Sequence, residues 1–170
     1  IADLHFPETN NGFAAYTKYD SLHVPIEGGI LKTENGGETW EKKPFTDGLI
    51  SIHFISLSTG FASKYNKAYG IYKTTDGGIN WKWVSECVTK DFVVVNSTTA
   101  YTTYVDEYGS VVVNQSINGG DSWQRVSVNF DLIHTFTNSG QSLFAVSGNY
   151  SGSANTATTM WRSADGVNWV

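Results

Sequence analysis

The sequence is poor in charged residues, in cysteine and in long apolar runs. Charged residues make up only 16% of the chain and the formal net charge is -5, so no basic surface is available for the phosphates of a nucleic acid. The single cysteine, Cys87, cannot form an internal disulfide, and such scarcity is compatible with bacterial export. No apolar run reaches the roughly 18 residues of a membrane span. We therefore expect neither nucleic-acid binding nor a membrane span.

The sequence is rich in aromatic residues, and many of them recur at a fixed period. Hydrophobic residues make up 40% of the 170 residues, which is enough for a folded core. Trp40, Trp81, Trp123 and Trp169 follow one another at intervals of 41, 42 and 46 residues. This is close to the roughly 40 to 50 residues of one four-stranded propeller blade. The segments that end at these tryptophans are GGILKTENGGETW, YGIYKTTDGGINW, VVVNQSINGGDSW and TTMWRSADGVNW.

Each segment predicts a strand, a tight turn and a second strand. Paired glycines, such as Gly36 and Gly37, allow the positive φ that the turn needs. The carboxylate or amide of the third motif residue can bond to turn amides, and the hydroxyl two residues before it can close the same network. The tryptophan is then expected to pack between neighbouring sheets. The residues concerned are Thr33, Asn35, Gly37, Trp40, Thr74, Asp76, Gly78, Trp81, Ser116, Asn118, Gly120, Trp123, Ser163, Asp165 and Trp169.

A second repeated pattern lies upstream of each turn, as in LHFPETNNGFAAY and IHFISLSTGFASK, and predicts two further strands. Together the two patterns predict an all-β fold, a β-propeller of four-stranded antiparallel blades with strands a to d numbered outward from the axis. We expect one domain over residues 1–170, with blades at about 1–47, 48–87, 88–130 and 131–170. The last blade is expected to be incomplete, because the sequence stops one residue after Trp169.

The motif S/T-x-D/N-x-G-x-x-W resembles the Asp box, or BNR repeat. It matches fully from Thr33, Thr74 and Ser116, whereas the copy from Ser163 is one residue shorter. The resemblance is to the family of sialidases, xyloglucanase-type hydrolases, sortilin-like receptors and photosystem II assembly factor-like propellers, and most of all to the last group. It implies that the box is a peripheral folding device, away from any active site. It also implies a larger ring, of which four blades are a fragment, or a small ring that is open or completed by an oligomer.

The connections between strands b and c should lie opposite the box turns, at the end where propellers usually bind ligands. They are expected at residues 16–28, 64–70, 104–109 and 147–158, and six of the nine tyrosines fall there. Tyrosine offers a flat apolar face and a hydroxyl, which suits protein or glycan recognition; padding of one loop against another is the alternative. The predicted ligand-binding residues are Tyr19, Tyr65, Tyr69, Tyr104, Tyr108, Tyr150, Asp106 and Glu107.

Catalytic motifs are scarce. The family's sialidases hold the substrate carboxylate with three arginines, and this sequence has only Arg125 and Arg162. A glycosidase needs two carboxyl groups about 5 to 10 Å apart, a distance that a sequence does not give. The catalytic residues therefore stay unknown. No cofactor or metal site is predicted, although His5, His53 and Asp91, which are aligned at one position of strand a, and nearby His134 leave a ring of metal ligands as an alternative to simple copying of the repeat.

The sequence thus predicts a non-catalytic binding or scaffold propeller that recognises a protein or a glycan through its tyrosine-rich loops. Two alternatives stay open: part of a polysaccharide-acting glycoside hydrolase, and a structural repeat of a larger surface or appendage protein. We expect an extracytoplasmic location, whether secreted, periplasmic or at the cell surface. Unpaired strand edges also predict self-association or further blades that complete the ring.

Overall fold

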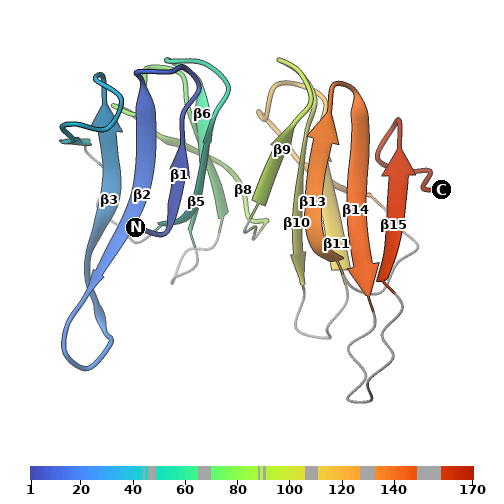
Figure 1. Ribbon diagram of the computed structural model, residues 1–170, viewed down its shortest axis with the longest axis horizontal. Coiled ribbons are helices and arrows are strands. Elements are labelled where there is room, and N and C mark those ends of the chain that lie inside the picture. The colour runs from blue at the N-terminus through green and yellow to red at the C-terminus, as the bar shows by residue number, and fades with distance from the viewer. Residues whose placement is uncertain are drawn as a thin grey trace. The chain divides into compact units, whose positions relative to one another are not determined.

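The protein is built from β-strands and tight turns. The computed structural model describes residues 1–43, 45, 49–64, 70–87, 89, 91–105, 111–126, 133–148 and 158–170. All fifteen elements within these ranges are strands, so the all-β prediction is confirmed. Figure 1 draws them as arrows. The same ranges contain no helix of the length and hydropathy that a membrane crossing requires.

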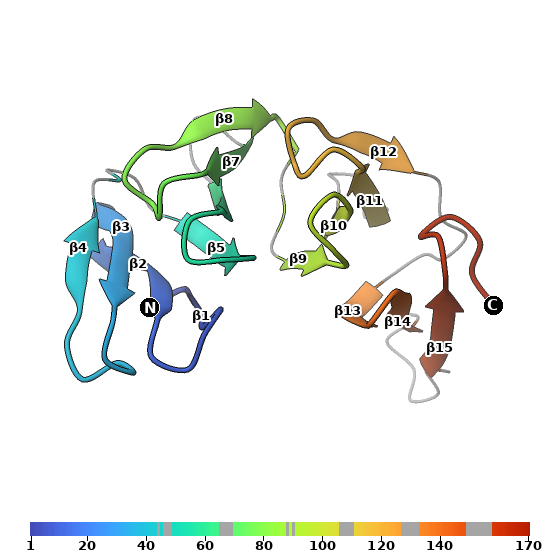
Figure 2. The ribbon, with the colours of Figure 1, turned by 90° about the horizontal axis from the view of Figure 1, so that it is seen from above.

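The strands form four antiparallel sheets (Figure 2), and within each sheet every strand pairs with its neighbour along the chain. The first sheet contains β1 (Asp3–His5), β2 (Gly12–Tyr19), β3 (Pro25–Thr33) and β4 (Glu41–Lys43). The second contains β5 (Leu49–Phe54), β6 (Gly60–Lys64), β7 (Gly70–Thr74) and β8 (Lys82–Ser85). The third contains β9 (Asp91–Val94), β10 (Ala100–Val105), β11 (Val111–Ser116) and β12 (Gln124–Val126). The fourth contains β13 (Ile133–Ser139), β14 (Ser142–Gly148) and β15 (Thr158–Ser163).

The chain divides into two compact units, Ile1–Phe92 and Val93–Val170, with the boundary inside β9. The first two sheets belong to the first unit, and the strands from β10 onward belong to the second.

The described part of the fourth sheet has three strands. Val170 nevertheless lies where a fourth strand would begin. Its amide donates to the carbonyl of Arg162 at 3.0 Å, and the amide of Arg162 donates back to Val170 at 2.8 Å. Lys32 of β3 pairs with Glu41 of β4 at the corresponding place in the first sheet.

The turn that follows the third strand of every sheet is held by one repeated set of hydrogen bonds. In the second sheet the buried Thr74 hydroxyl donates to Asp76 Oδ1 at 2.9 Å and accepts from the Gly78 amide at 3.0 Å. Asp76 Oδ1 also accepts from the amides of Ile79 and Asn80, and the Asn80 amide is the main cause that lowers the pKa of Asp76. A short polar side chain thus satisfies amides that no strand reaches.

The other three turns repeat this arrangement with conservative exchanges. Asn35 and Asn118 replace the aspartate, and the hydroxyls of Thr33 and Ser116 accept from amides four residues on. In the fourth turn the hydroxyl of Ser163 accepts from an amide only three residues on, at 2.8 Å, because that turn is one residue shorter. After each turn follows a half-buried tryptophan, and the indoles of Trp40, Trp81 and Trp169 donate to the carbonyls of Gly37, Gly78 and Gly166, with Trp123 at the same place in the third sheet.

Within the first unit, the core lies between the first two sheets. Phe13 of β2 stacks on Phe54 of β5, with ring centroids 3.4 Å apart and planes 4° from parallel. Trp81 meets Phe54 edge-on, and Ile30 and Ile52 fill the same fully buried cluster. Burying an aromatic or aliphatic side chain of this size contributes about 1.5 to 3 kcal/mol, so this cluster joins the two sheets firmly.

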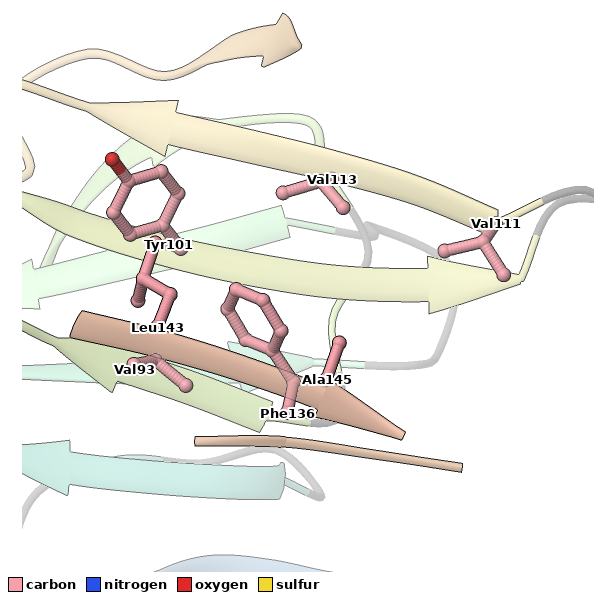
Figure 3. Close-up of a cluster of buried hydrophobic side chains, with 7 residues drawn as sticks. All are labelled: Val93, Tyr101, Val111, Val113, Phe136, Leu143 and Ala145. Carbon is pink, nitrogen blue, oxygen red and sulfur yellow. The ribbon is translucent and has the colours of Figure 1, made fainter. Parts of the chain in front are cut away.

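Within the second unit, an equivalent core joins strands of the third sheet to the fourth (Figure 3). Tyr101 of β10 and Val113 of β11 pack against Phe136, Leu143 and Ala145 of β13 and β14. The Tyr101 hydroxyl donates to the carbonyl of Asp165 at 2.8 Å, which ties the turn of the fourth sheet to the third. The same strand positions therefore form both cores, as expected for successive propeller blades.

Candidate functional site

The connection between the second and third strands of the first sheet is a projecting β-hairpin, the extended blue ribbon in Figure 1. β2 continues to Tyr19 and β3 begins at Pro25, with a register shift between Lys18 and Tyr19. The expected loop over residues 16–28 is therefore wrong in extent, because backbone pairing continues on both sides and only residues 20–24 turn the chain. We name residues 19–26 the β2–β3 tip.

Asp20 organises the β2–β3 tip. Its Oδ1 accepts hydrogen bonds from the amides of Leu22 and Val24, each at 2.8 Å. Its backbone amide donates to the Val24 carbonyl at 2.9 Å. His23 takes a positive φ of 60° within the turn, a conformation that histidine adopts more readily than most side chains. These bonds give the tip a defined shape.

The β2–β3 tip exposes large apolar side chains. Leu22 is 80% exposed, and Tyr19, Val24 and Ile26 are also exposed. Single exposed apolar residues are ordinary, but several of them on one short hairpin are typical of an interaction surface. The tyrosine was predicted as a binding residue, whereas the three aliphatic residues were missed. Their alternation in LHVPI around a turn-forming aspartate is the signal that could have revealed them.

The base of the hairpin carries a polar cluster. Glu27 forms an ion pair with Lys42, accepts from the Tyr16 hydroxyl at 3.0 Å, and has a lowered pKa chiefly because of the hydrogen bond from Lys42. Lys42 also lies over the ring of Tyr16, 5.6 Å from its centroid. Both carboxylates of this connection, Asp20 and Glu27, are thus engaged in bonds that hold the hairpin.

Of the other predicted binding residues, the structure describes only Tyr104. Tyr104 is a partly buried residue within β10, paired with Val112, so its placement in a loop was wrong: the backbone ladder of β10 and β11 continues to Val105 and Val111. The structure does not bring Tyr104 together with Tyr19 in one sheet. The remaining predicted residues, Tyr65, Tyr69, Asp106, Glu107, Tyr108 and Tyr150, lie outside the described residues.

His5 and His53 meet between β1 and β5, with ring centroids 4.0 Å apart. His5 Nδ1 accepts from the amide of Phe54 at 3.2 Å, while Asp3 accepts from the amide of Ile52 at 2.8 Å. Burial lowers the pKa of both imidazoles, that of His53 to about 4. The two neutral rings therefore pack as part of the contact between sheets. Across the described ranges, no three His, Cys, Asp or Glu residues group in a way that could hold a metal.

The alignment of Asp91 with these histidines was wrong. The amide of Val95 donates to the Thr99 carbonyl as the amide of Ile55 donates to Thr59, so the residue of β9 equivalent to His53 is Val93. In β13, a register irregularity lies between Ile133 and Thr135, where His134 falls. The hydrogen bonds of the turns identify the equivalent positions in these strands. Matching the Asp-Phe of the third repeat to the His-Phe of the first two repeats does not.

Other reactive groups are engaged or buried. Cys87 is half-buried, and burial raises the pKa of its thiol, so the thiolate is disfavoured. Arg162 donates to the Ser142 hydroxyl at 3.1 Å. The feature of the described residues that we take as the candidate site is the exposed apolar surface at the β2–β3 tip.

These sheets are blades of a β-propeller, and known structures of that class match the chain. The match to the structure of YCF48 bound to D1 peptide covers 99% of this chain and 50% of that chain, at 16% identity and a TM-score of 0.60. It covers 28% of the GH74 xyloglucanase from Xanthomonas campestris at 14% identity and a TM-score of 0.64. It covers 38% of TolB from Acinetobacter baumannii at 15% identity and a TM-score of 0.62.

The chain thus spans half or less of the length of these three proteins. No protein-family model and no curated protein matches the sequence. At identities this low, the likeness shows the fold.

Proposed function

We propose that the chain is a non-catalytic protein-binding propeller module, and that its β2–β3 tip contacts the partner. The observation that carries this proposal is the group of exposed apolar side chains on a turn that Asp20 holds in shape. A preorganised surface loses little conformational entropy on binding, which favours affinity.

The chemistry of the tip favours a polypeptide over a glycan. Leu22, Val24 and Ile26 are aliphatic, and aliphatic surface gains free energy by removal from water against another apolar surface. The phenolic hydroxyl of Tyr19, an exposed residue of the same tip, can order a polar group of the partner. The structure of YCF48 bound to a peptide gives this proposal a precedent within the same fold.

The repeated turns fit the same proposal as a scaffold. We infer that they are Asp boxes, since their hydroxyl, carboxylate or amide, glycine and tryptophan contacts hold the blade periphery. They lie at the opposite end of each sheet from the connection between the second and third strands. In line with the Asp-box resemblance and the single cysteine, we place the module outside the cytoplasm.

Binding to defined peptides tests the proposal. Linear peptides selected from a displayed library would be synthesised, and their Kd for the chain measured by fluorescence anisotropy. The variant L22D/V24D should weaken binding about a hundredfold, because each buried aliphatic side chain contributes about 1.5 kcal/mol and 1.4 kcal/mol is tenfold in affinity.

The matched control is I79D/I117D, which places the same charges on exposed apolar residues of two turns at the other end of their sheets. It should leave the Kd unchanged. Equal losses in both variants would contradict a site at the tip. Binding to a glycan panel without peptide binding would favour glycan recognition, and hydrolysis of xyloglucan by the purified chain would favour the hydrolase alternative.

A further inference from the structure

The first strand of the second sheet, β5, is bound to β1 through side chains. β5 pairs with β6 along one edge, and within the described sheets no strand pairs with its other edge. On that free edge the Ile52 amide donates to Asp3 Oδ2 at 2.8 Å, and the Phe54 amide donates to His5 Nδ1 at 3.2 Å. Two side chains of β1 thus supply acceptors that a neighbouring strand would otherwise supply. We name the contact of Asp3 and His5 with residues 51–54 the β1–β5 joint.

The bond from Phe54 requires that Nδ1 of His5 carries no proton. A neutral imidazole accepts through its unprotonated nitrogen, whereas both nitrogens of the protonated ring are donors. Protonation of Nδ1 would place two donors against each other and leave the Phe54 amide without its acceptor. The bond between His5 and Phe54 is therefore specific to one protonation state of the imidazole.

The surroundings of His5 also disfavour a positive charge. His53 lies beside it, with ring centroids 4.0 Å apart, so charging both rings would bring like charges together. The residues that pair with these two histidines on β2 and β6 are Phe13 and Phe61, and both are buried and apolar. Burial is the largest cause that lowers the pKa of His5.

Asp3 acts in the opposite direction. Among the described residues, the charged or titratable groups that face the two rings from β1, β2, β5 and β6 are Asp3 and the rings themselves. The Asp3 carboxylate raises the pKa of both rings, but burial outweighs it. Asp3 lies two residues from His5 on the same face of β1, so a charged His5 that leaves Phe54 has an alternative partner on its own strand.

We propose that the β1–β5 joint is an acid-sensitive contact: when His5 takes up a proton it releases the Phe54 amide, and β1 separates locally from β5 while the sheets stay folded. The stack of Phe13 on Phe54 and the rest of the first core do not titrate, so they continue to join the two sheets. β1 belongs to the sheet whose β2–β3 hairpin projects. The joint therefore makes one attachment of that sheet depend on pH.

Hydrogen exchange of the Phe54 amide, measured by NMR across pH and corrected for the intrinsic exchange rate, tests this proposal. In the opened joint His5 regains its ordinary pKa of 6.5, so opening should become more favourable as the pH falls below that value. Between about pH 7.5 and 5.5 the protection of the Phe54 amide should fall by up to about tenfold, because each pH unit below the pKa is a factor of ten. Low urea should not accelerate this exchange, whereas it should accelerate exchange of those β6 amides that open by global unfolding.

H5N is the informative variant, because the amide oxygen of asparagine can accept from Phe54 and does not titrate. Its Phe54 protection should stay constant over the same pH range. The matched control H23N removes an exposed histidine of the β2–β3 tip and should keep the wild-type dependence.

Three results would overturn the proposal. The first is constant protection of Phe54 in the wild-type chain, and the second is the full wild-type dependence in H5N. The third is Phe54 exchange that follows the β6 amides in urea, because opening would then occur only by global unfolding. The wild-type profile and its urea dependence decide the matter even if H5N does not fold.

Discussion

Gly166 and Gly140 offer a matched test of how the fourth sheet packs, because both have positive φ but only one is crowded. Gly166 has φ of 74° in the repeated turn, and Gly140 has φ of 57° in the turn between β13 and β14. A Cβ built at Gly166 would lie 2.2 Å from a ring carbon of Tyr101. A Cβ at Gly140 would meet nothing within 4 Å.

The magnitudes follow from these contacts. Alanine in the left-handed region costs about 1 to 2 kcal/mol at either position. At Gly166 the overlap with the buried Tyr101 ring adds about 1 to 3 kcal/mol, and displacement of its hydroxyl from the Asp165 carbonyl adds about 1 kcal/mol. G140A should therefore lower the free energy of unfolding by about 1 to 2 kcal/mol, and G166A by about twice that or more.

Urea unfolding followed by tryptophan fluorescence measures both variants, with the midpoint of each transition compared at constant m-value. The larger loss in G166A should disappear in the Tyr101→Ala background, because the clash then has no partner, although that background is itself less stable. Equal losses for G140A and G166A in the wild-type background would refute the packing of the fourth-sheet turn on Tyr101.

Three further outcomes are expected. T74V removes the hydroxyl that accepts from the buried Gly78 amide, so it should lower the free energy of unfolding by about 1 to 3 kcal/mol in urea titrations. The control T137V, at an exposed strand position, should change it by less than about 0.5 kcal/mol. D20A removes the acceptor of the Leu22 and Val24 amides and should accelerate their hydrogen exchange about tenfold, from a loss of about 1 kcal/mol, with the Ile52 amide as an unchanged reference. The pKa of His53 falls from 6.5 to about 4 on folding, so the unfolded chain takes up a proton first as the pH is lowered. The stability that this histidine contributes should be full above pH 6.5, and the free energy of unfolding should fall by on the order of 3 kcal/mol between pH 6.5 and 4. H53F should flatten this part of the pH profile.

The blades could be predicted from the sequence because their periodic signals are local. The third strand of each sheet ends at the hydroxyl of Thr33, Thr74, Ser116 or Ser163, where side-chain bonds to turn amides stop the ladder. Each such turn needs only residues within a span of eight, so its geometry is written in a short motif. The assignment of residues 1–170 to one domain stays a prediction.

The hairpin was not predictable in the same way. Polar residues at successive positions favour a loop in a sequence, and Thr17, Lys18 and Glu27 are such residues. They nevertheless pair as strand residues, in a projecting hairpin that is solvated on both faces. The exposure of Leu22 and Ile26 is likewise a property of where the hairpin projects, which no local pattern fixes.

The predicted alignment of the third repeat was wrong for a related reason. Matching Asp91 to His53 makes the stretch up to Ala100 two residues longer than the stretch up to Gly60, whereas matching Val93 to His53 makes 93–100 and 53–60 equal in length. The bond from the Val95 amide to the Thr99 carbonyl, like that from Ile55 to Thr59, shows that the turn keeps its geometry and that the second alignment is the correct one.

Mapping a bound peptide onto the chain tests whether the β2–β3 tip is the binding surface. Backbone amide shifts would be recorded by NMR on the labelled chain during titration with a selected peptide. We expect the largest changes within residues 19–26, with little change at the repeated turns around Asn35, Asp76, Asn118 and Asp165. Changes centred on those turns, with the β2–β3 tip unaffected, would contradict it.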